Sequence, residues 1–148
     1  MARSRRSTRP RPREGSGSDR TRYASGTPWE PKVGYSLAIR VGSRIYVSGT
    51  TATAPDGSLV GRGDAYAQAA QALDNIERAL AALGGERGDI VRLRVYVTDI
   101  GDFEAIARAL GERFREVRPA NTLVQVAALV DPAMKVEIEA DADVPAGR

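Results

Sequence analysis

Apolar and polar residues alternate in two neighbouring segments, 36–41 and 44–49, and this pattern predicts two β-strands. The apolar members of the alternation are Leu37, Ile39, Val41, Ile45 and Val47. Gly42 and Ser43 lie between the segments and are typical of a tight turn. The two strands are therefore expected to form a β-hairpin with these apolar side chains on one face.

Apolar residues recur at helical spacing in two later segments, each bounded by residues that start and stop helices. In the first, Asp64 stands at the N-cap position, and Gly84 and Gly85 end the run. Its apolar stripe consists of Ala65, Ala69, Ala72, Ile76, Leu80 and Leu83. In the second, Asp102 can cap the helix and Pro119 ends it. Its buried stripe is predicted to consist of Phe103, Ile106, Ala107, Leu110, Phe114 and Val117.

Alternation with a period of two returns in three further segments, which predicts three more strands. They are 89–98, 121–129 and 135–141. In the first of them the apolar face is predicted to hold Val91, Leu93, Val95 and Val97. The predicted order of elements is ββαβαββ, an α+β fold with a single mixed β-sheet. Both helices must then pack on the apolar face of this sheet.

The opposite face of the predicted sheet is expected to be mixed in polarity. It carries Tyr46, Ser48, Arg94, Tyr96, Glu137 and Glu139 beside small or apolar residues. Such a face either contacts water or meets another subunit and lines a cleft there. The periodicity of the sequence is compatible with both arrangements.

The composition excludes several classes of mechanism, because the 148 residues include no cysteine and no histidine. This leaves no thiolate or imidazole nucleophile, no Ser-His-Asp triad and no zinc site with nitrogen or sulfur ligands. We expect no metal and no cofactor, and chemistry that uses carboxylates, hydroxyls, arginine, backbone groups and water. A core built without disulfides favours a cytoplasmic protein. No segment offers the roughly 18 consecutive apolar residues that a membrane span needs.

Charge divides the chain into a basic tail and an acidic domain. Residues 1–22 carry eight arginines against two carboxylates, whereas the other residues carry 14 basic and 17 acidic side chains. Residues 1–27 are rich in Arg, Ser, Pro and Gly and are predicted to be disordered, because they hold too few apolar side chains to offset the entropy of ordering. Residues 28–145 are predicted to form one domain. The tail is either a solvated extension or an arm that binds nucleic acid or another acidic partner, whereas no nucleic-acid binding is expected of the domain.

Six short segments, in order and correctly spaced, resemble the RidA family, also known as the YjgF/YER057c or endoribonuclease L-PSP-like proteins. They are Gly34-Tyr35-Ser36, Tyr46-Val47-Ser48-Gly49-Thr50, Gln68 with 71–76, Val95-Tyr96-Val97-Thr98-Asp99, Arg118-Pro119-Ala120 and Val136-Glu137-Ile138-Glu139-Ala140. Together they span roughly Pro31 to Val144. The resemblance implies a chorismate-mutase-like α+β fold, a homotrimer, and polar clefts between neighbouring subunits.

The best-known members of this family hydrolyse enamines and imines made by pyridoxal-phosphate enzymes, which releases a 2-oxo acid and ammonia. In them an arginine after the Pro-Ala pair binds the substrate carboxylate, a tyrosine closes the pocket, and a glutamate on the last strand positions or activates water. The resemblance implies that Tyr35 and Glu137 are the catalytic residues, because they match this tyrosine and this glutamate. Asn121 stands at the position of the arginine, and a neutral amide lacks both its charge and its bidentate geometry.

The candidate ligand-binding residues are Asn121, Ser48, Gly49, Tyr96 and Arg94. Arg94 either replaces the missing arginine or forms an ion pair with Glu137 or Glu139 across the sheet. Glu137 also has a plain alternative, because charged residues two apart on one strand face occur for solubility and to prevent aggregation.

Two functions from different classes follow. The first is a trimer whose intersubunit cleft binds a small carbonyl, imine or enamine compound and hydrolyses imines with altered specificity, with Glu137 directing water. The second is a non-catalytic module that keeps the fold and the cleft but senses a ligand or binds a partner. Ribonuclease activity, which one name of the family suggests, is the least favoured, because the domain is acidic and has no histidine.

Overall fold

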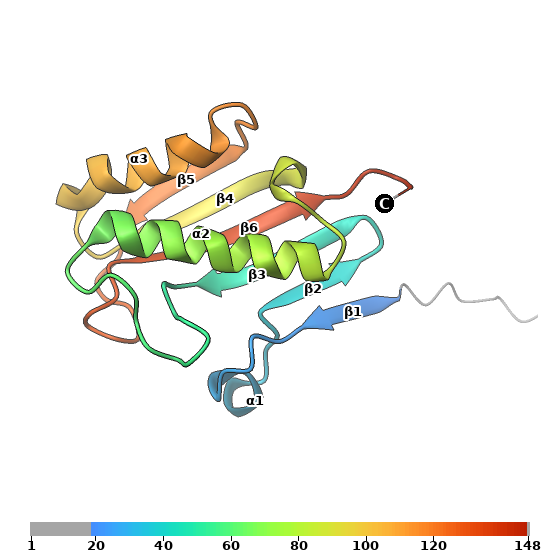
Figure 1. Cartoon of the computed structure of the whole chain (residues 1–148), viewed down its shortest axis with the longest axis horizontal. Coiled ribbons are helices and arrows are strands. Elements are labelled where there is room, and N and C mark those ends of the chain that lie inside the picture. The colour runs from blue at the N-terminus through green and yellow to red at the C-terminus, as the bar shows by residue number, and fades with distance from the viewer. Residues whose placement is uncertain (1–18, 148) are drawn as a thin grey trace, which may run out of the picture.

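The computed structural model describes residues 19–147 and contains one six-stranded β-sheet with two long helices (Figure 1). The strands are β1 (Arg20–Tyr23), β2 (Ala38–Val41), β3 (Arg44–Thr50), β4 (Ile90–Val97), β5 (Ala120–Gln125) and β6 (Val136–Asp143). The helices are α1 (Trp29–Val33), α2 (Ala65–Ala82) and α3 (Phe103–Phe114), and the 3-10 turns are η1 (Arg87–Asp89) and η2 (Ile100–Asp102). The predicted single sheet, with the order ββαβαββ from β2 onward apart from the short 3-10 turns, is confirmed.

The strands lie in the order β1-β2-β3-β6-β4-β5, so the C-terminal strand occupies the middle of the sheet. β4 and β5 are parallel and the other neighbours are antiparallel, which confirms that the sheet is mixed. The parallel pair is connected through α3, because parallel neighbours require a crossover. With β6 between β3 and β4, side chains from three distant parts of the sequence share each face.

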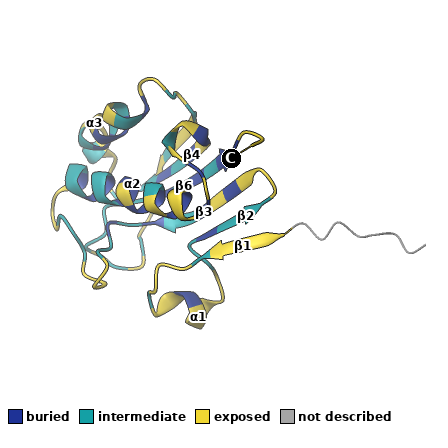
Figure 2. Cartoon of the chain, turned by 45° about the vertical axis from the view of Figure 1, so that its right-hand side comes forward, coloured by how far each residue is buried: buried dark blue, intermediate teal, exposed yellow. Residues whose placement is uncertain are grey.

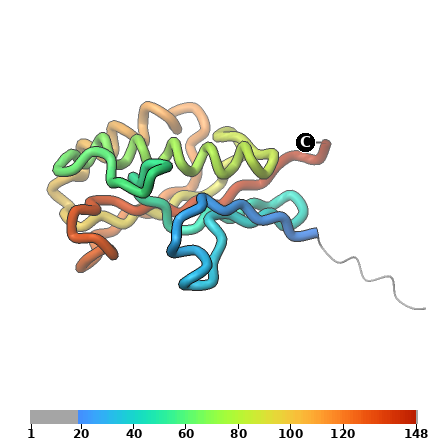
Figure 3. Tube along the Cα trace, turned by 60° about the horizontal axis from the view of Figure 1, so that its bottom comes forward, coloured from blue at the N-terminus to red at the C-terminus, as the bar shows by residue number. Residues whose placement is uncertain are grey.

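Helices α2 and α3 cover the same face of the sheet and leave the other face open (Figures 1 and 3). In Figure 2 the buried residues lie on the central strands and on the sheet-facing side of the helices. The small side chains of Ala69 and Ala72 are fully buried and let α2 approach the sheet closely. The largest fully buried side chains include Ile45, Leu73, Ile76, Leu80, Leu93, Ile106 and Ile138.

Helix α2 begins and ends where the sequence predicts. Asp64 Oδ1 accepts a hydrogen bond from the Ala67 N–H at 3.0 Å, which caps the first turn. At the other end the chain leaves the helix through Leu83 and Gly84, and Gly84 has a left-handed φ of 80°. Neither α2 nor any other helix within residues 19–147 is long and apolar enough to cross a membrane.

Helix α3 differs from the prediction in its first turn. Asp102 makes no capping hydrogen bond, and its carboxylate instead forms an ion pair with Lys135 at 3.0 Å. Asp99 instead accepts a hydrogen bond from the Gly101 N–H and opens the turn η2. Phe103, the first residue of the helix, is 45% exposed, and the buried stripe consists of Ile106, Ala109, Leu110 and Phe114.

The faces of β2 are opposite to those predicted. Ala38 is fully buried in the core, whereas Ile39 pairs with Tyr46 on the open face. Arg40 points toward the helices, where its Nη1 donates a hydrogen bond to the Leu83 carbonyl oxygen at 2.7 Å. In this register Arg40 supplies a hydrogen-bond donor to a carbonyl group at the C-terminal end of α2, and the larger apolar side chains of β2 lie on the open face.

A β-bulge near the start of β4 moves Val91 out of the predicted core face. The register with β6 shifts between Ile90 and Arg92, so Val91 is unmatched and 51% exposed. The other predicted core residues of this strand are buried as expected: Leu93, Val95 and Val97.

The segment predicted as a disordered tail is ordered at its C-terminal end. Residues Arg20–Tyr23 form β1, which pairs with β2 at the edge of the sheet, and Tyr23 packs against the core. Backbone hydrogen bonds therefore supply the order that the composition of this segment does not indicate. The prediction of disorder is wrong for residues 20–23, and residues 1–18 lie outside the described residues.

Candidate functional site

The open face of the sheet brings together six of the seven candidate residues. They are Tyr35, Ser48, Gly49, Arg94, Tyr96 and Glu137. In the register of the sheet Tyr96 lies beside Glu137, and Arg94 lies beside Glu139. Because alternate residues of a strand share a face, the neighbouring strands β4 and β6 present these side chains on the same surface.

Glu137 is a half-buried residue whose carboxylate has no hydrogen bond or ion pair within residues 19–147. Burial, and secondarily the negative charge of Glu139, raises the pKa of Glu137 above the usual glutamate value. Gly49 packs directly against this side chain, and a Cβ added at Gly49 would lie 2.9 Å from Glu137 Cδ. The missing side chain of Gly49 therefore makes the room in which the carboxylate lies.

Arg94 is held by two carboxylates other than that of Glu137. Its Nη1 lies 3.4 Å from Glu139 Oε2 and 3.3 Å from Asp141 Oδ2. The Tyr96 hydroxyl donates a hydrogen bond to Glu139 Oε1 at 3.2 Å, and burial is the main reason why the pKa of Tyr96 is raised. The sequence left two roles open for Arg94, replacement of the missing arginine or an ion pair with Glu137 or Glu139. The structure shows the ion pair, and of these two glutamates the partner is Glu139.

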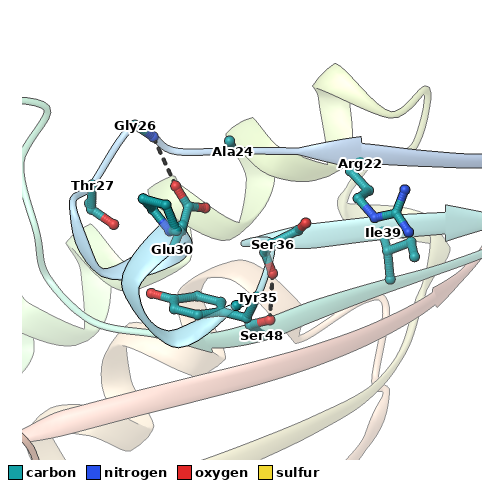
Figure 4. Close-up of a pocket in the computed structure, with 11 residues that line it drawn as sticks. Arg22, Ala24, Gly26, Thr27, Glu30, Tyr35, Ser36, Ile39 and Ser48 are labelled. Atoms are coloured by element: carbon teal, nitrogen blue, oxygen red, sulfur yellow. Dashed lines mark hydrogen bonds between the residues drawn. The ribbon is translucent and has the colours of Figure 1, made fainter.

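Tyr35 borders a groove of about 770 Å³ beside β1 and β2 (Figure 4). Ser36, Ser48, Ile39 and Arg22 also line it. The Ser48 hydroxyl donates a hydrogen bond to the Ser36 carbonyl oxygen at 2.8 Å. Since this bond uses the hydroxyl proton, Ser48 offers a ligand in the groove its oxygen lone pairs.

The segment that carries Tyr35 is held by Glu30, a residue that the sequence pattern does not single out. Glu30 is 5% exposed. Its carboxylate accepts hydrogen bonds at 2.9–3.0 Å from three backbone N–H groups, those of Ser25, Gly26 and Leu37. Figure 4 shows the bond from Gly26. Its carbonyl oxygen also accepts a hydrogen bond from the Tyr35 N–H at 3.1 Å. The amino-acid sequence gives only a weak indication of this role of Glu30, which is that an acidic residue follows shortly after Ser25 and Gly26 in a segment without hydrophobic periodicity.

Asn121 lies on the opposite side of the sheet from Glu137. β5 runs parallel to β4 with Asn121 beside Leu93, a core residue that is 1% exposed. Asn121 therefore faces the helix layer, where it lines a second cavity of about 250 Å³ at the C-terminal end of α3. The other lining residues are Leu93, Leu110, Gly111, Phe114, Arg115, Arg118 and Pro119. A small ligand on Glu137 cannot reach Asn121 of the same chain.

The groups on the open face can position water and move protons. Glu137 supplies an acid or a base, and the hydroxyls of Tyr35 and Tyr96 supply hydrogen bonds. Within residues 19–147 no three acidic side chains are grouped so that they could hold a metal ion.

Known proteins share both the sequence and the fold of this chain. A family model described as endoribonuclease L-PSP matches residues 26–144. The crystal structure of Rv2704 from Mycobacterium tuberculosis, a member of the YjgF/YER057c/UK114 family, is 41% identical and superposes with a TM-score of 0.78 over 85% of this chain and 100% of Rv2704. The 3-aminoacrylate deaminase RutC of Acinetobacter baylyi is 35% identical over 119 residues, 80% of this chain and 93% of RutC. The 2-iminobutanoate/2-iminopropanoate deaminase of Capra hircus is 37% identical over 106 residues, 72% of this chain and 77% of that protein.

The family match extends from before α1 to beyond the end of β6, so it includes both long helices and the strands that carry the candidate residues. The resemblance inferred from the six sequence segments is therefore confirmed. This chain belongs to the endoribonuclease L-PSP family, which is the RidA family.

Proposed function

We propose that this protein binds a small carbonyl, imine or enamine compound in a cleft between the subunits of a homotrimer, and that it hydrolyses imines there with a specificity altered by Asn121. The observation that carries the proposal is the environment of Glu137, a half-buried carboxylate that has no partner among residues 19–147 and stands beside Gly49. The two relatives whose names describe deaminases of 3-aminoacrylate and of 2-imino acids support the substrate class.

Imine hydrolysis needs a group that first accepts a proton and then returns it. Glu137 accepts a proton from water while the water oxygen adds to the imine carbon, and it delivers this proton to the nitrogen. Glu137 next takes the proton of the new hydroxyl group and passes it to the nitrogen, so that the carbonyl forms, the carbon–nitrogen bond breaks, and ammonia leaves. A carboxyl group with a raised pKa suits both halves of this exchange, because a raised pKa makes the carboxylate a stronger base toward water.

The homotrimer is supported by the separation of the candidate residues within one chain. Glu137 and Asn121 lie on opposite sides of the sheet, so a site that uses both needs two chains. The open face also carries exposed apolar side chains, since Tyr46 is 41% and Val124 is 43% exposed. A neighbouring subunit that packs on this face would cover them and would complete the cleft.

The test is hydrolysis of 2-aminoacrylate and of 2-iminobutanoate, each generated in a coupled assay. Glu137→Gln should reduce turnover by about a hundredfold or more, because an amide cannot accept the proton of water. Glu104→Gln is the matched control: it removes an exposed carboxylate in the first turn of α3 and should keep native turnover. Unchanged turnover in Glu137→Gln would exclude the catalytic role.

The neutral amide of Asn121 favours a second candidate function, a non-catalytic module that binds a ligand or a partner in the same cleft. The assay separates the two functions when Asn121→Arg is included. Activity that appears only in Asn121→Arg indicates an intact apparatus with altered specificity. Activity in neither form favours the binding module.

A further inference from the structure

Strand β1 forms one edge of the sheet, and within residues 19–147 no strand pairs with its outer side (Figure 1). Its residues are largely exposed (Figure 2). An edge strand directs part of its main-chain N–H and C=O groups away from the sheet, so another extended segment can pair with it. The sheet can therefore be extended by a further strand at β1.

The direction of the main-chain groups in β2 follows from one hydrogen bond. The Ser48 N–H donates to the Leu37 carbonyl oxygen at 2.8 Å, so Leu37, just before β2, faces β3. The residues of an antiparallel strand direct their main-chain groups alternately to its two neighbours. Ile39 therefore also faces β3, whereas Ala38 and Arg40 face β1.

The same alternation assigns the outward groups of β1 to its two arginines. Thr21 and Tyr23 lie opposite the two β2 residues that face β1, so Arg20 and Arg22 direct their N–H and C=O groups to the free edge. Both arginine side chains lie on the open face, because Arg22 is opposite Ile39 and two residues from Arg20. They are exposed, and no carboxylate within residues 19–147 pairs with either guanidinium group.

The middle of the sheet shows which side chains fit arginines in this pattern. Arg92 and Arg94 alternate on β4, and Asp141 and Glu139 lie directly opposite them on β6. The Arg94 guanidinium lies 3.4 Å from the Glu139 carboxylate and 3.3 Å from that of Asp141. An extended segment with acidic residues two apart is therefore complementary to the two arginines of β1 in both spacing and charge.

The two edge strands of a second copy of this chain do not supply such a segment. Two β1 strands that paired with each other would bring their arginines together, and like charges opposite each other destabilise a strand pair. β5, the other edge strand of the described sheet, has the sequence Ala-Asn-Thr-Leu-Val-Gln, which carries no charge. Nucleic acid supplies negative charge but no alternating N–H and C=O groups. The free main-chain groups and the cations together favour an acidic peptide.

We propose that the free edge of β1 binds an extended acidic segment of a partner protein. The segment adds to the sheet as a seventh strand, antiparallel to β1, and places two carboxylates two residues apart opposite Arg20 and Arg22. Main-chain hydrogen bonds pair the strands, and the alternating carboxylates select for acidic partners. This inference is independent of the proposed function, since it uses neither Glu137 nor Asn121.

The test is binding of a fluorescent peptide to the full chain at low salt, measured by anisotropy. The peptide is Val-Glu-Ile-Glu-Ala, the acidic alternation with which β6 begins. Arg22→Gln should weaken binding about threefold, and Arg20→Gln combined with Arg22→Gln about tenfold, because each substitution removes one exposed ion pair. Arg62→Gln is the matched control: it removes an exposed arginine outside β1 and should leave the affinity nearly unchanged.

A second peptide separates strand pairing from general attraction to a chain whose residues 1–22 include eight arginines. It is methylated at the main-chain nitrogen of both glutamates, which keeps its charge but removes the two N–H donors that face β1. It should bind about tenfold more weakly than the unmodified peptide. In the complex with the unmodified peptide, amide hydrogen exchange should slow at Arg20 and Arg22 and change little at Thr21 and Tyr23.

The proposal is overturned if the native chain does not bind the unmodified peptide, if both peptides bind equally, or if the doubly substituted chain keeps native affinity. An oligouridylate that displaces the peptide and binds more tightly than it would assign the edge to nucleic acid instead. Slower exchange at Arg20 and Arg22 without peptide, at concentrations where copies associate, would assign it to a second copy.

Discussion

Glu137 and Glu139 are two residues apart on β6 and face the same side of the sheet, yet their surroundings differ. Glu139 receives an ion pair from Arg94 and a hydrogen bond from Tyr96, whereas Glu137 has neither. Gly49, at an irregularity in the pairing of β3 with β6, leaves room beside Glu137 but offers it no polar side chain. Two identical side chains thus differ in chemistry because their neighbours across the sheet differ.

Ionisation of Glu137 is expected to destabilise the folded protein. Burial raises its folded-state pKa, so the folded protein holds this proton more tightly than the unfolded chain does. The resulting stabilisation is complete below the unfolded pKa of about 4.3 and is lost as the pH rises through the folded pKa. Glu137→Gln carries no charge at any pH, and it should melt at a higher temperature than the native protein near pH 7.

Thermal melts from about pH 4 to pH 8 measure this difference. The advantage of Glu137→Gln over the native protein should shrink toward acid pH, where Glu137 is protonated in both states. Glu104→Gln should show no such trend, because Glu104 is exposed. Equal melting temperatures of Glu137→Gln and the native protein near pH 7 would contradict the prediction.

At the scale of secondary-structure elements, buried polar side chains hold in place the segments that carry the site. Gln68 on α2 is fully buried, and its amide exchanges hydrogen bonds with three backbone groups, the carbonyls of Gly61 and Ala133 and the N–H of Lys135. Lys135 lies two residues before Glu137, so this amide fixes the start of β6. Gln68 belongs to the segments that resemble the family, and here its role is structural.

Glu30 performs the same task for the segment of Tyr35. Glu30→Gln leaves one acceptor oxygen for three backbone N–H groups, and a buried donor without an acceptor costs about 1–3 kcal/mol. We expect a lower midpoint of urea unfolding, together with a raised KM for imine substrates and a smaller change in kcat. If Glu30 acts by positioning Tyr35, Glu30→Gln should change KM much less in a Tyr35→Ala background. Additive effects on KM would show that Glu30 supports only the fold.

At the scale of the whole molecule, one face of the sheet is covered by α2 and α3 and the other is open (Figures 1 and 3). The open face holds Glu137 and the groove of Tyr35, and the helix side holds Asn121 with its cavity. In the site that we propose, these groups on opposite sides of the sheet meet only when a second copy is present. Oligomerisation and ligand binding are therefore expected to depend on each other.

Val124 tests this dependence, because it lies on the open face of the outer strand β5 beside Tyr96. Light scattering should give the native protein three times the mass of one chain, and Val124→Asp should shift it toward the monomer. Phe103→Asp is the matched control: Phe103 is similarly exposed but lies on α3, and its replacement should leave the mass unchanged. A native monomer, or a Val124→Asp trimer as stable as the native one, would argue against an interface on this face.

Local patterns predicted the elements of this fold well. The predicted α2, with its Asp64 cap and its glycine end, matches the structure, because helix periodicity and capping involve residues within a few positions of each other. The faces of β2 and the position of Val91 were predicted wrongly. Both depend on a register with other strands, and shifting a register by one residue exchanges the two faces.

The amino-acid sequence by itself determined the family, the order of the elements and the identity of the candidate residues, since these follow from short segments and their spacing. Only the tertiary structure decided which of those residues share a surface. It left Glu137 without a partner among residues 19–147, paired Arg94 with Glu139, and placed Asn121 across the sheet beside Arg118. The physical reason is that charge pairing and burial depend on contacts between strands far apart in the sequence, which the alternation within one strand does not encode.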